Sequence, residues 1–491
     1  HRGTYTSMAK NKRNNRKSEI SLHNAEAISI INSVLNGREY PKEELDGLWK
    51  LVLLNQFHDV LPGSSIEEVY KDSDAHYEKV LTSCDKLIKD GLTDMFGGSQ
   101  VKEPIAVNLS GAEADGTVKV NGETYEILNV PSYGYKKMSG NLITENSVIG
   151  NGEFIENDFY KIEFDEKGAI TSLFDKRFNK ETVKHGGKLN EFVIYEDEPR
   201  CYDNWEINEY YKLKYRNFDE VSKPVFITDG SRCGVKRTYR TEKSSLTQTV
   251  WLYSKLDRID FETTAEWNEH HQLLRTLFPF NIHSAKATYE IQFGNLERAT
   301  HSNTSWDEAK FEVCAQKWAD VSDGGYGISL INDCKYGHSC SGSELGLTLI
   351  KCGTYPNKHA DEGEHIFSYS LLPHGGDYRA ANTVGKALNF NMPLMTVNGK
   401  ISDGEYSFVS TDSKNVIIDT LKKAEDSNDL IVRLYESADI SKKTVISFAA
   451  EPREVILCDL MENEISVIAH SGNRAELDVS NFEIITLKVK F

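Results

Sequence analysis

Long hydrophobic runs, proline and paired cysteines are scarce in this chain of 491 residues. No apolar run approaches the roughly 18 residues that a membrane-spanning helix requires, so we expect no membrane partner. The chain does not open with the basic and apolar segments of a secretory signal peptide, and its eight cysteines form no Cys-x-x-Cys motif. These absences favour a cytoplasmic protein with reduced thiols over a secreted disulfide scaffold.

Positive charge is also in deficit, with 57 lysine and arginine residues against 75 aspartate and glutamate residues. The net charge of −18 argues against nucleic acid as a partner, because a polyanion would be repelled. A neutral sugar is compatible with this charge. The hydrophobic content of 39% is ordinary for a globular protein, and the length predicts about three or four domains.

The first ninety or so residues have the pattern of three amphipathic helices. Apolar residues recur at helical spacing from Ile20 to Leu35, and Asn36-Gly37 ends that pattern. Pro41 can open a second helix, and Pro62-Gly63 ends that helix just after His58. Ser65 and Glu68 form the signature of a capping box at the start of a third helix. Three such helices joined by short breaks predict a bundle.

From about Glu103 the pattern changes to short β-rich runs separated by Gly, Asn and Asp turns. Residues Asp165 to Gly168 follow an alternating stretch and predict a hairpin turn. Many short strands at regular spacing favour antiparallel sandwiches over βαβ units. The predicted fold class is therefore α+β and multidomain, with a three-helix bundle followed by β-sandwich domains that are mainly antiparallel.

The segment from Leu54 to Ile66 is the strongest candidate for a functional site. It places His58 and Asp59 between two helix ends, where an imidazole could bind a metal and a carboxylate could contact a neighbouring ligand. The alternatives are a core histidine with its hydrogen bonds satisfied, and an aspartate that is solvated or caps the next helix. The residues of this segment alone leave both alternatives open.

A second candidate site lies in a predicted loop that contains Tyr202, Asp203 and Trp205. Aromatic rings stack on sugar faces and acids accept hydroxyl protons, so this composition suits a glycan pocket. An aromatic cluster at the edge of a sandwich explains it equally well.

Two further groups of histidines invite a metal interpretation that we do not favour. His359, Asp361 and His365 are closely spaced, but we expect a loop held by side-chain hydrogen bonds. The adjacent His270 and His271 would point to opposite faces of a strand, so we assign both to structure.

The segment around His58 resembles a zinc-ligand motif of the glycoside hydrolase family 38 alpha-mannosidases, in the variant of their cytosolic and bacterial branch. Other segments resemble the same family in the family's order: His1 to Ser7, Ile194 to Trp205, Asn303 to Asp307, Asn332 to His338, Ala360-Asp361 with His365, and Leu430 to Glu436. In the family, the segment containing Asp361 matches a β-region motif and not the zinc pair. This chain has Asp203-Asn204-Trp205 where the family commonly has Asp-Ala-Trp.

The resemblance implies a zinc-dependent retaining alpha-mannosidase that removes terminal alpha-linked mannose from oligosaccharides. It implies that His58 is a zinc ligand, that Asp59 contacts the substrate, and that Tyr202, Asp203 and Trp205 line the sugar site. The nucleophile and the acid/base group are expected in an N-terminal catalytic domain, so no catalytic residue is assigned in this chain and the chain alone should be inactive. Its expected partners are a mannose-containing oligosaccharide, that N-terminal domain and a second copy in a homodimer.

The changes of pattern along the sequence, among them a shift near Asn389, and the resemblance together predict four domains. They are a helical middle domain (1–95), a small β domain (96–140), a large mutarotase-like β-sandwich (141–388) and a terminal β-sandwich (389–491). An alternative of a different class is a noncatalytic carbohydrate-binding β-sandwich protein, which would explain the aromatic loop and would need no zinc.

Overall fold

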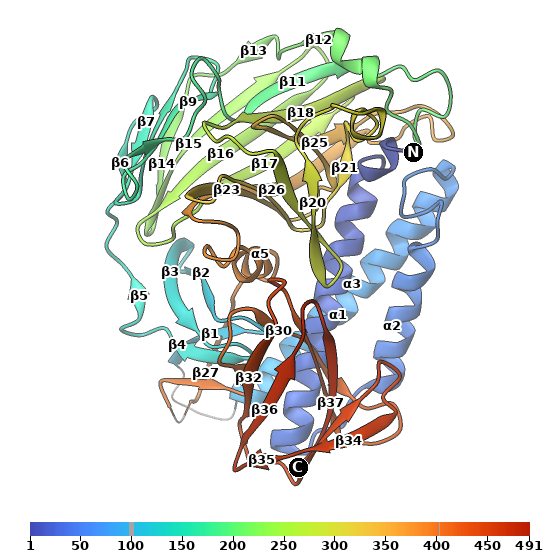
Figure 1. Ribbon diagram of the computed structural model, residues 1–491, viewed down its shortest axis with the longest axis vertical. Coiled ribbons are helices and arrows are strands. Elements are labelled where there is room, and N and C mark those ends of the chain that lie inside the picture. Colours follow the sequence, from blue (N-terminus) through green and yellow to red (C-terminus); the bar gives the residue numbers. More distant parts are fainter. Residues whose placement is uncertain (98–102, 402) are drawn as a thin grey trace.

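Three long helices begin the chain in the computed structural model, which describes residues 1–97, 103–401 and 403–491. They are α1 (Ala9–Asn36), α2 (Lys42–Asn55) and α3 (Glu67–Phe96), and they lie side by side as the predicted bundle (Figure 1). Gly37 ends α1 in the left-handed region at φ 64°. The predicted capping box is wrong, because α3 begins after Ile66 and no side chain caps it.

Helix α1 is buried around much of its circumference, unlike α2 and α3. It packs on α3 and also against strands of the β domains, so polar residues such as Lys12 and Arg16 are buried with the apolar ones. The Arg16 guanidinium donates to Tyr336 Oη and to the carbonyl of Asn332, and its centre lies 4.3 Å from the Tyr336 ring centroid. These contacts fix the bundle on the large β region.

The large β region contains three antiparallel sheets, of ten, six and five strands. In sheet order the ten strands are β13 (Glu220–Val221), β15 (Arg232–Arg240), β16 (Ser245–Tyr253), β17 (Ile259–Trp267), β26 (Gly363–Gly375), β23 (Tyr326–Asn332), β22 (Trp318–Ser322), β19 (Lys286–Ile291) and β20 (Gly294–Ala299), with β14 (Val225–Asp229) paired to β15. The six are β12 (Tyr215–Arg216), β11 (Glu191–Glu196), β18 (Gln272–Pro279), β25 (Glu344–Lys351), β24 (Gly337–Ser341) and β21 (Val313–Cys314). The five are β10 (Lys180–Glu181), β9 (Ile170–Asp175), β8 (Tyr160–Phe164), β7 (Phe154–Glu156) and β6 (Ile149–Gly150).

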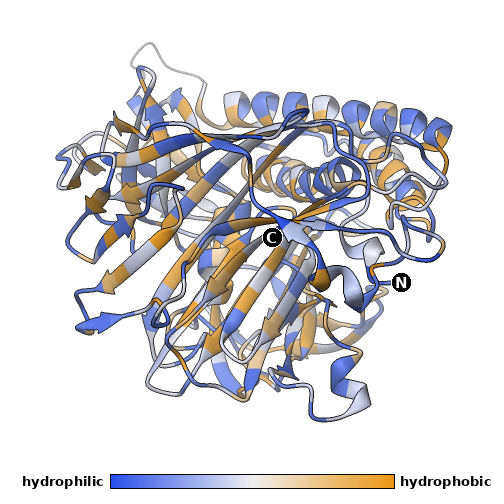
Figure 2. Cartoon of the chain, turned by 90° about the horizontal axis from the view of Figure 1, so that it is seen from above, coloured by the Kyte–Doolittle hydropathy of each residue, from blue (hydrophilic) through white to orange (hydrophobic). Residues whose placement is uncertain are grey.

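The core of this region lies between the sheets. Hydrophobic and hydrophilic residues alternate along its strands (Figure 2), as in β17, where Phe261 is buried and Glu262 is exposed. Phe261 and Tyr369 stack at 4.9 Å between ring centroids. The predicted hairpin is confirmed, because the Gly168 N–H donates to Asp165 O between β8 and β9.

A small sheet beside the bundle combines residues from two distant parts of the chain. Its order is β27 (Met395–Gly399), β1 (Glu103–Asn108), β4 (Gly134–Lys137) and β28 (Glu405–Ser407), so strands beyond residue 389 flank strands from the predicted 96–140 domain. A three-stranded sheet of β2 (Ala114–Val120), β3 (Glu123–Val130) and β5 (Leu142–Ile143) adjoins it. The four domain boundaries stay a prediction, and residues 98–102 and 402 within them lie outside the described residues.

The C-terminal residues form two facing antiparallel sheets. One contains β29 (Val409–Thr411), β32 (Lys442–Phe448), β36 (Arg474–Val479) and β35 (His470–Ser471). The other contains β30 (Val416–Lys423), β31 (Leu430–Glu436), β37 (Ile484–Lys490), β33 (Glu454–Cys458) and β34 (Glu464–Ile468). Two short helices, α4 (Ser305–Glu308) and α5 (Thr383–Asn391), complete the α+β fold that the sequence predicts.

Candidate functional site

The turn between α2 and α3 presents His58 to solvent. The side chain is 75% exposed, and its Nε2 lies 3.4 Å from Asp59 Oδ2. The imidazole also lies against the Phe57 ring, with 4.2 Å between centroids. His58 is therefore not a core histidine, and its ring nitrogens are accessible to a ligand from outside the chain.

Asp59 is held by the serines that follow it. Ser64 Oγ donates to Asp59 Oδ1 at 2.8 Å, which leaves Oδ2 on the side of His58. Ser65 Oγ donates to the main-chain oxygen of Asp59 at 2.9 Å. Ser65 thus stabilises the turn and not the start of α3 as the sequence suggested. Gly63, which precedes Ser64, has φ 91°, a conformation that a residue with a side chain rarely adopts.

The loop that carries Tyr202, Asp203 and Trp205 contacts this turn directly. The Asn204 side-chain amide donates to Gly63 O at 3.2 Å, and Ser7 Oγ donates to Asn204 O at 2.6 Å. The Gly3 N–H donates to Trp205 O at 2.8 Å. The structure therefore brings the two candidate sites together, and the asparagine that departs from the family pattern supplies one of the contacts.

The aromatic rings of Tyr202 and Tyr355 border a hollow beside this loop. Tyr202 lies 5.7 Å from Trp205 and 6.4 Å from Tyr355 between ring centroids. Tyr202 and Tyr355 are each 57% exposed, so their rings are open to a ligand. The hollow measures about 690 Å³, and its lining residues are Glu198, Pro199, Cys201, Tyr202, Asp203, His271 and Tyr355.

Asp203 itself is buried, and backbone donors occupy its carboxylate. Oδ2 accepts from the Thr354 N–H at 2.6 Å, and Oδ1 accepts from the Tyr355 N–H at 2.9 Å. The side chain is 9% exposed, and His271 Nδ1 lies 3.7 Å away. This geometry favours a positioning role, in which Asp203 holds Tyr355 at the hollow, over direct contact with a sugar.

Tyr355 and His271 are residues of the hollow that the sequence did not indicate. Both lie in connections between strands, where no periodic pattern marks them. His271 has φ 51° and does not belong to a strand, so the expectation that His270 and His271 point to opposite faces of a strand is wrong.

The cluster of His359, Asp361 and His365 has the structural hydrogen bonds that we expected. Asp361 accepts from the main-chain N–H groups of Met8 and Ala9 at the start of α1. His365 Nε2 hydrogen-bonds with Asp361 O at 2.8 Å, and burial lowers the pKa of His365 to about 4. Among residues 1–97, 103–401 and 403–491 no group of three His, Cys, Asp or Glu residues has a geometry that could hold a metal ion.

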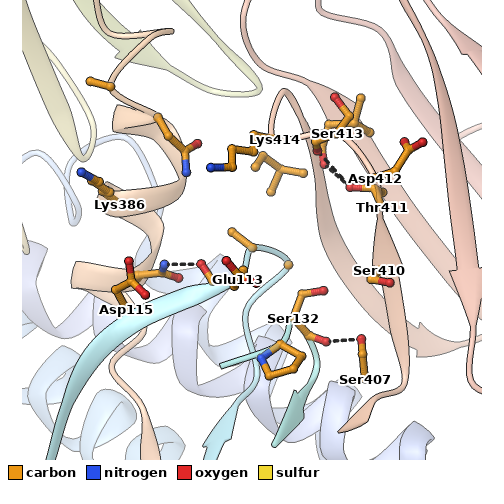
Figure 3. Close-up of a pocket in the computed structure, with 18 of the residues that line it drawn as sticks. Glu113, Asp115, Ser132, Lys386, Ser407, Ser410, Thr411, Asp412, Ser413 and Lys414 are labelled. Carbon is orange, nitrogen blue, oxygen red and sulfur yellow. Dashed lines mark hydrogen bonds between the residues drawn. The ribbon is translucent and has the colours of Figure 1, made fainter. Parts of the chain in front are cut away.

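A second hollow of about 680 Å³ lies where α5, the small β domain and the terminal sandwich meet (Figure 3). Lys386 on α5 is paired with Asp257, and Ser407 Oγ donates to Ser132 O. The lining residues of this second hollow include no aromatic residue and no histidine. We therefore place the candidate site at His58 and not here.

In the part of the chain that the structure describes, no helix is both long enough and apolar enough to cross a membrane.

Three segments match known families. Residues 1–95 match the alpha mannosidase middle domain, residues 155–359 match the C-terminal domain of the glycosyl hydrolases family 38, and residues 415–487 match the C-terminal beta sandwich domain of the same family.

Similar proteins cover the chain from end to end. It is 32% identical to Alpha-mannosidase 2C1 of Homo sapiens over 99% of this chain and 49% of that protein. It is 33% identical to Alpha-mannosidase of Saccharomyces cerevisiae over 100% of this chain and 48% of that protein. The chain thus spans about half the length of these curated relatives. A crystal structure of an alpha-mannosidase from Enterococcus faecalis V583 has the same fold, with a TM-score of 0.83 and 16% identity over 99% of this chain and 68% of that one.

Proposed function

Since this chain belongs to glycoside hydrolase family 38, whose relatives reported above are alpha-mannosidases, we propose that it forms the middle and C-terminal part of a zinc-dependent retaining alpha-mannosidase. The complete enzyme would remove terminal alpha-linked mannose from oligosaccharides. The observation that carries the proposal is the exposed imidazole of His58, on a turn that Ser64 and Ser65 stabilise and that contacts the loop of the aromatic hollow.

His58 fits the role of one zinc ligand. Its ring nitrogens are accessible, and the neighbouring Asp59 carboxylate keeps one oxygen on the same side. A catalytic zinc needs about three protein ligands, so the other ligands would come from outside the described residues. A bound zinc ion would supply Lewis-acid contact to two adjacent sugar hydroxyls. Asp59 would accept a hydrogen bond from a hydroxyl of the same sugar.

The aromatic hollow would hold the sugars next to the cleaved bond. Tyr202 and Tyr355 are each more than half exposed, and Trp205 packs edge-to-face against Tyr202. Such rings stack on the apolar faces of hexoses, while Glu198 at the rim could accept hydroxyl protons. Asp203 would act indirectly, through the position of Tyr355.

The turn that carries His58 also offers a surface for the N-terminal catalytic domain. Four large apolar residues near it are at least 50% exposed: Leu53, Leu54, Phe57 and Ile66. Exposed apolar residues at a site that lacks most of its metal ligands support the proposal that another domain binds there and covers them. That domain would supply the nucleophile and the acid/base group of a retaining mechanism. We also propose a cytoplasmic location, which the eight free cysteines support, whereas a homodimer stays a prediction.

The test compares His58→Ala and Asp59→Asn in the full-length enzyme by zinc analysis and steady-state kinetics. We expect His58→Ala to lose both zinc and activity, because one imidazole is removed from the coordination shell. Asp59→Asn should keep zinc and lose turnover, because a contact that strengthens in the transition state affects kcat. Full zinc occupancy in His58→Ala would refute the ligand role. Hydrolysis of an aryl alpha-mannoside by the 491-residue chain alone would refute the assignment of catalytic residues to another domain.

A noncatalytic carbohydrate-binding protein is the second candidate, because the exposed rings of Tyr202 and Tyr355 could bind a glycan without zinc. It predicts that the 491-residue chain binds mannose oligosaccharides in calorimetry and that His58→Ala binds them unchanged.

A further inference from the structure

Lys12 places a buried ammonium group directly behind the turn that carries His58. The residue lies in the first turn of α1 and is 5% exposed. Its Nζ donates to Leu61 O at 2.9 Å, to Pro62 O at 3.0 Å and to Ser7 O. All three protons of the ammonium group are thereby used on main-chain carbonyls.

The helix that carries Lys12 is itself anchored at its start. Both carboxylate oxygens of Asp361 accept main-chain N–H groups there, from Met8 at 2.7 Å and from Ala9 at 2.6 Å. Arg16, one turn further along, is fixed to Asn332 at the end of β23 and to Tyr336 in the loop that follows. Lys12 therefore extends from a rigid mount between the large β region and the α2–α3 turn.

Retention of a charge at this position requires an explanation. Burying an ammonium group costs far more than burying an aliphatic side chain of the same length, and burial lowers the pKa of Lys12. An apolar residue would fill the space more cheaply, but it would leave three carbonyls without the donor that they have now. The ammonium group thus orients the main chain at residues 61 and 62.

The orientation of this main chain decides where His58 points. Leu61 and Pro62 follow His58-Asp59 within the same turn, and the Asn11 side-chain amide donates to Val60 O at 3.1 Å beside them. Ser7 joins the same cluster and also donates to Asn204 O, which lies in the aromatic loop. The Lys12 ammonium group therefore hydrogen-bonds with both the turn and the N-terminal segment, and Ser7 connects it to the loop that borders the aromatic hollow.

We infer that Lys12 is a positioning residue of the zinc site, whose ammonium group fixes the turn so that the His58 imidazole and the Asp59 carboxylate face the metal and the sugar. The inference rests on the proposed function for its consequences in the complete enzyme. Its structural content, the fixed turn, can be measured in the chain alone.

The first experiment measures amide hydrogen exchange in the 491-residue chain. Lys12→Met removes the donor and keeps the length of the side chain. Lys10→Met is the matched control, because Lys10 lies on the same helix and pairs with Asp74 at the surface. In Lys12→Met we expect the amide protons of residues 56–61 and 63–66 to exchange at least about tenfold faster, because buried carbonyls lose their partners. Lys10→Met should leave them unchanged.

Lys12→Arg and Lys12→Gln keep the test informative if Lys12→Met fails to fold. Arginine retains the charge and its donors, so exchange in the turn should stay within about threefold of the wild-type rate. Glutamine retains two N–H groups on a shorter side chain and should lie between arginine and methionine. Wild-type exchange rates in the turn for Lys12→Gln or Lys12→Met would overturn the inference.

The second experiment measures the zinc dissociation constant and the kinetics of the full-length enzyme, with His58→Ala in parallel. Lys12→Met should weaken zinc binding by about 10- to 100-fold, as loss of a ligand's supporting contacts does, and Lys12→Arg should restore most of it. At saturating zinc, kcat should fall with little change in KM. If His58→Ala loses zinc while Lys12→Met binds it as tightly as the wild type, the positioning role fails and the proposed function stands. If His58→Ala keeps its zinc, the proposed function fails, and the exchange experiment alone judges Lys12.

Discussion

Gly63 offers a direct test of how tightly the turn that carries His58 is packed. A Cβ atom at this position would lie 2.2 Å from Ser7 O and 2.5 Å from Ser7 C, and both are main-chain atoms that cannot rotate away. The φ of 91° adds backbone strain for any residue other than glycine. Gly63→Ala therefore combines two costs. Strain at positive φ amounts to about 1–2 kcal/mol, and overpacking adds about 1–3 kcal/mol.

Gly37→Ala is the matched control for this substitution. Gly37 also has a positive φ, of 64°, but no atom lies within 4 Å of an added Cβ. It should show the strain alone, about 1–2 kcal/mol at the end of α1. The difference between the two variants then isolates the contact with Ser7.

Native-state hydrogen exchange measures both effects, because it reports local opening free energies and does not require the whole chain to unfold in one step. We expect the opening free energy of residues 56–66 to fall by about 2–5 kcal/mol in Gly63→Ala and to stay unchanged in Gly37→Ala. In the complete enzyme Gly63→Ala should also weaken zinc binding. An equal effect of the two substitutions on their own segments would show that the turn can move away from Ser7, which would refute the packing argument.

Three further predictions concern the surrounding structure. Burial lowers the pKa of His338 to about 4, so the folded chain binds fewer protons than the unfolded chain between about pH 4 and pH 6.5, and stability should rise with pH across that window by at most about 3 kcal/mol from this residue. Thermal midpoints at pH 4.5 and 7 should therefore differ less in His338→Gln than in the wild type, whereas the exposed His185→Gln should match the wild type. Lys351→Met would leave the Asp197 carboxylate buried without its partner and should lower the free energy of unfolding in urea by about 3–5 kcal/mol. The double variant Lys351→Met/Asp197→Leu should recover most of this loss. A double variant as unstable as the single one would contradict the argument. Asp203→Asn should raise KM several-fold in the complete enzyme without loss of zinc, because an amide facing the Thr354 and Tyr355 N–H groups would displace Tyr355; unchanged KM would argue against the positioning role of Asp203.

Periodicity predicted those helices that bury one face, and it misses the part of α1 that is held by other domains. The apolar stripe begins only at Ile20, whereas α1 begins at Ala9, and the residues between are mostly polar. They are helical because Asp361 satisfies the first N–H groups and because Arg16 binds Tyr336 and Asn332. All three partner residues lie more than 300 residues away, so no local pattern records them.

The residues of the candidate site also fall into those that the sequence indicated and those that it did not. His58 and Asp59 stand in one continuous segment with a recognisable motif, and the aromatic loop could be found by composition. His271 and Tyr355 lie in connections between strands, and Lys12 reaches the site through a buried contact with the turn. Their neighbours in the sequence do not indicate a role for any of the three. Asp203 was predicted to contact the sugar from the composition of its loop and from the family resemblance. Only the positions of the Thr354 and Tyr355 N–H groups reveal that its carboxylate is already occupied.

The small sheet beside the bundle has a consequence for how the chain is made. Strands β1 and β4 are synthesised before their outer partners β27 and β28, which follow about 260 residues later, and this interval takes roughly 13–50 s at about 5–20 residues per second. During that time both free edges of the β1–β4 pair can form hydrogen bonds with other chains. A ribosome that stalls between residues 140 and 390 would therefore carry a nascent chain with two open edges. Chaperone contacts with nascent chains of increasing length should be strongest in this interval and should decline once Ser407 has left the exit tunnel.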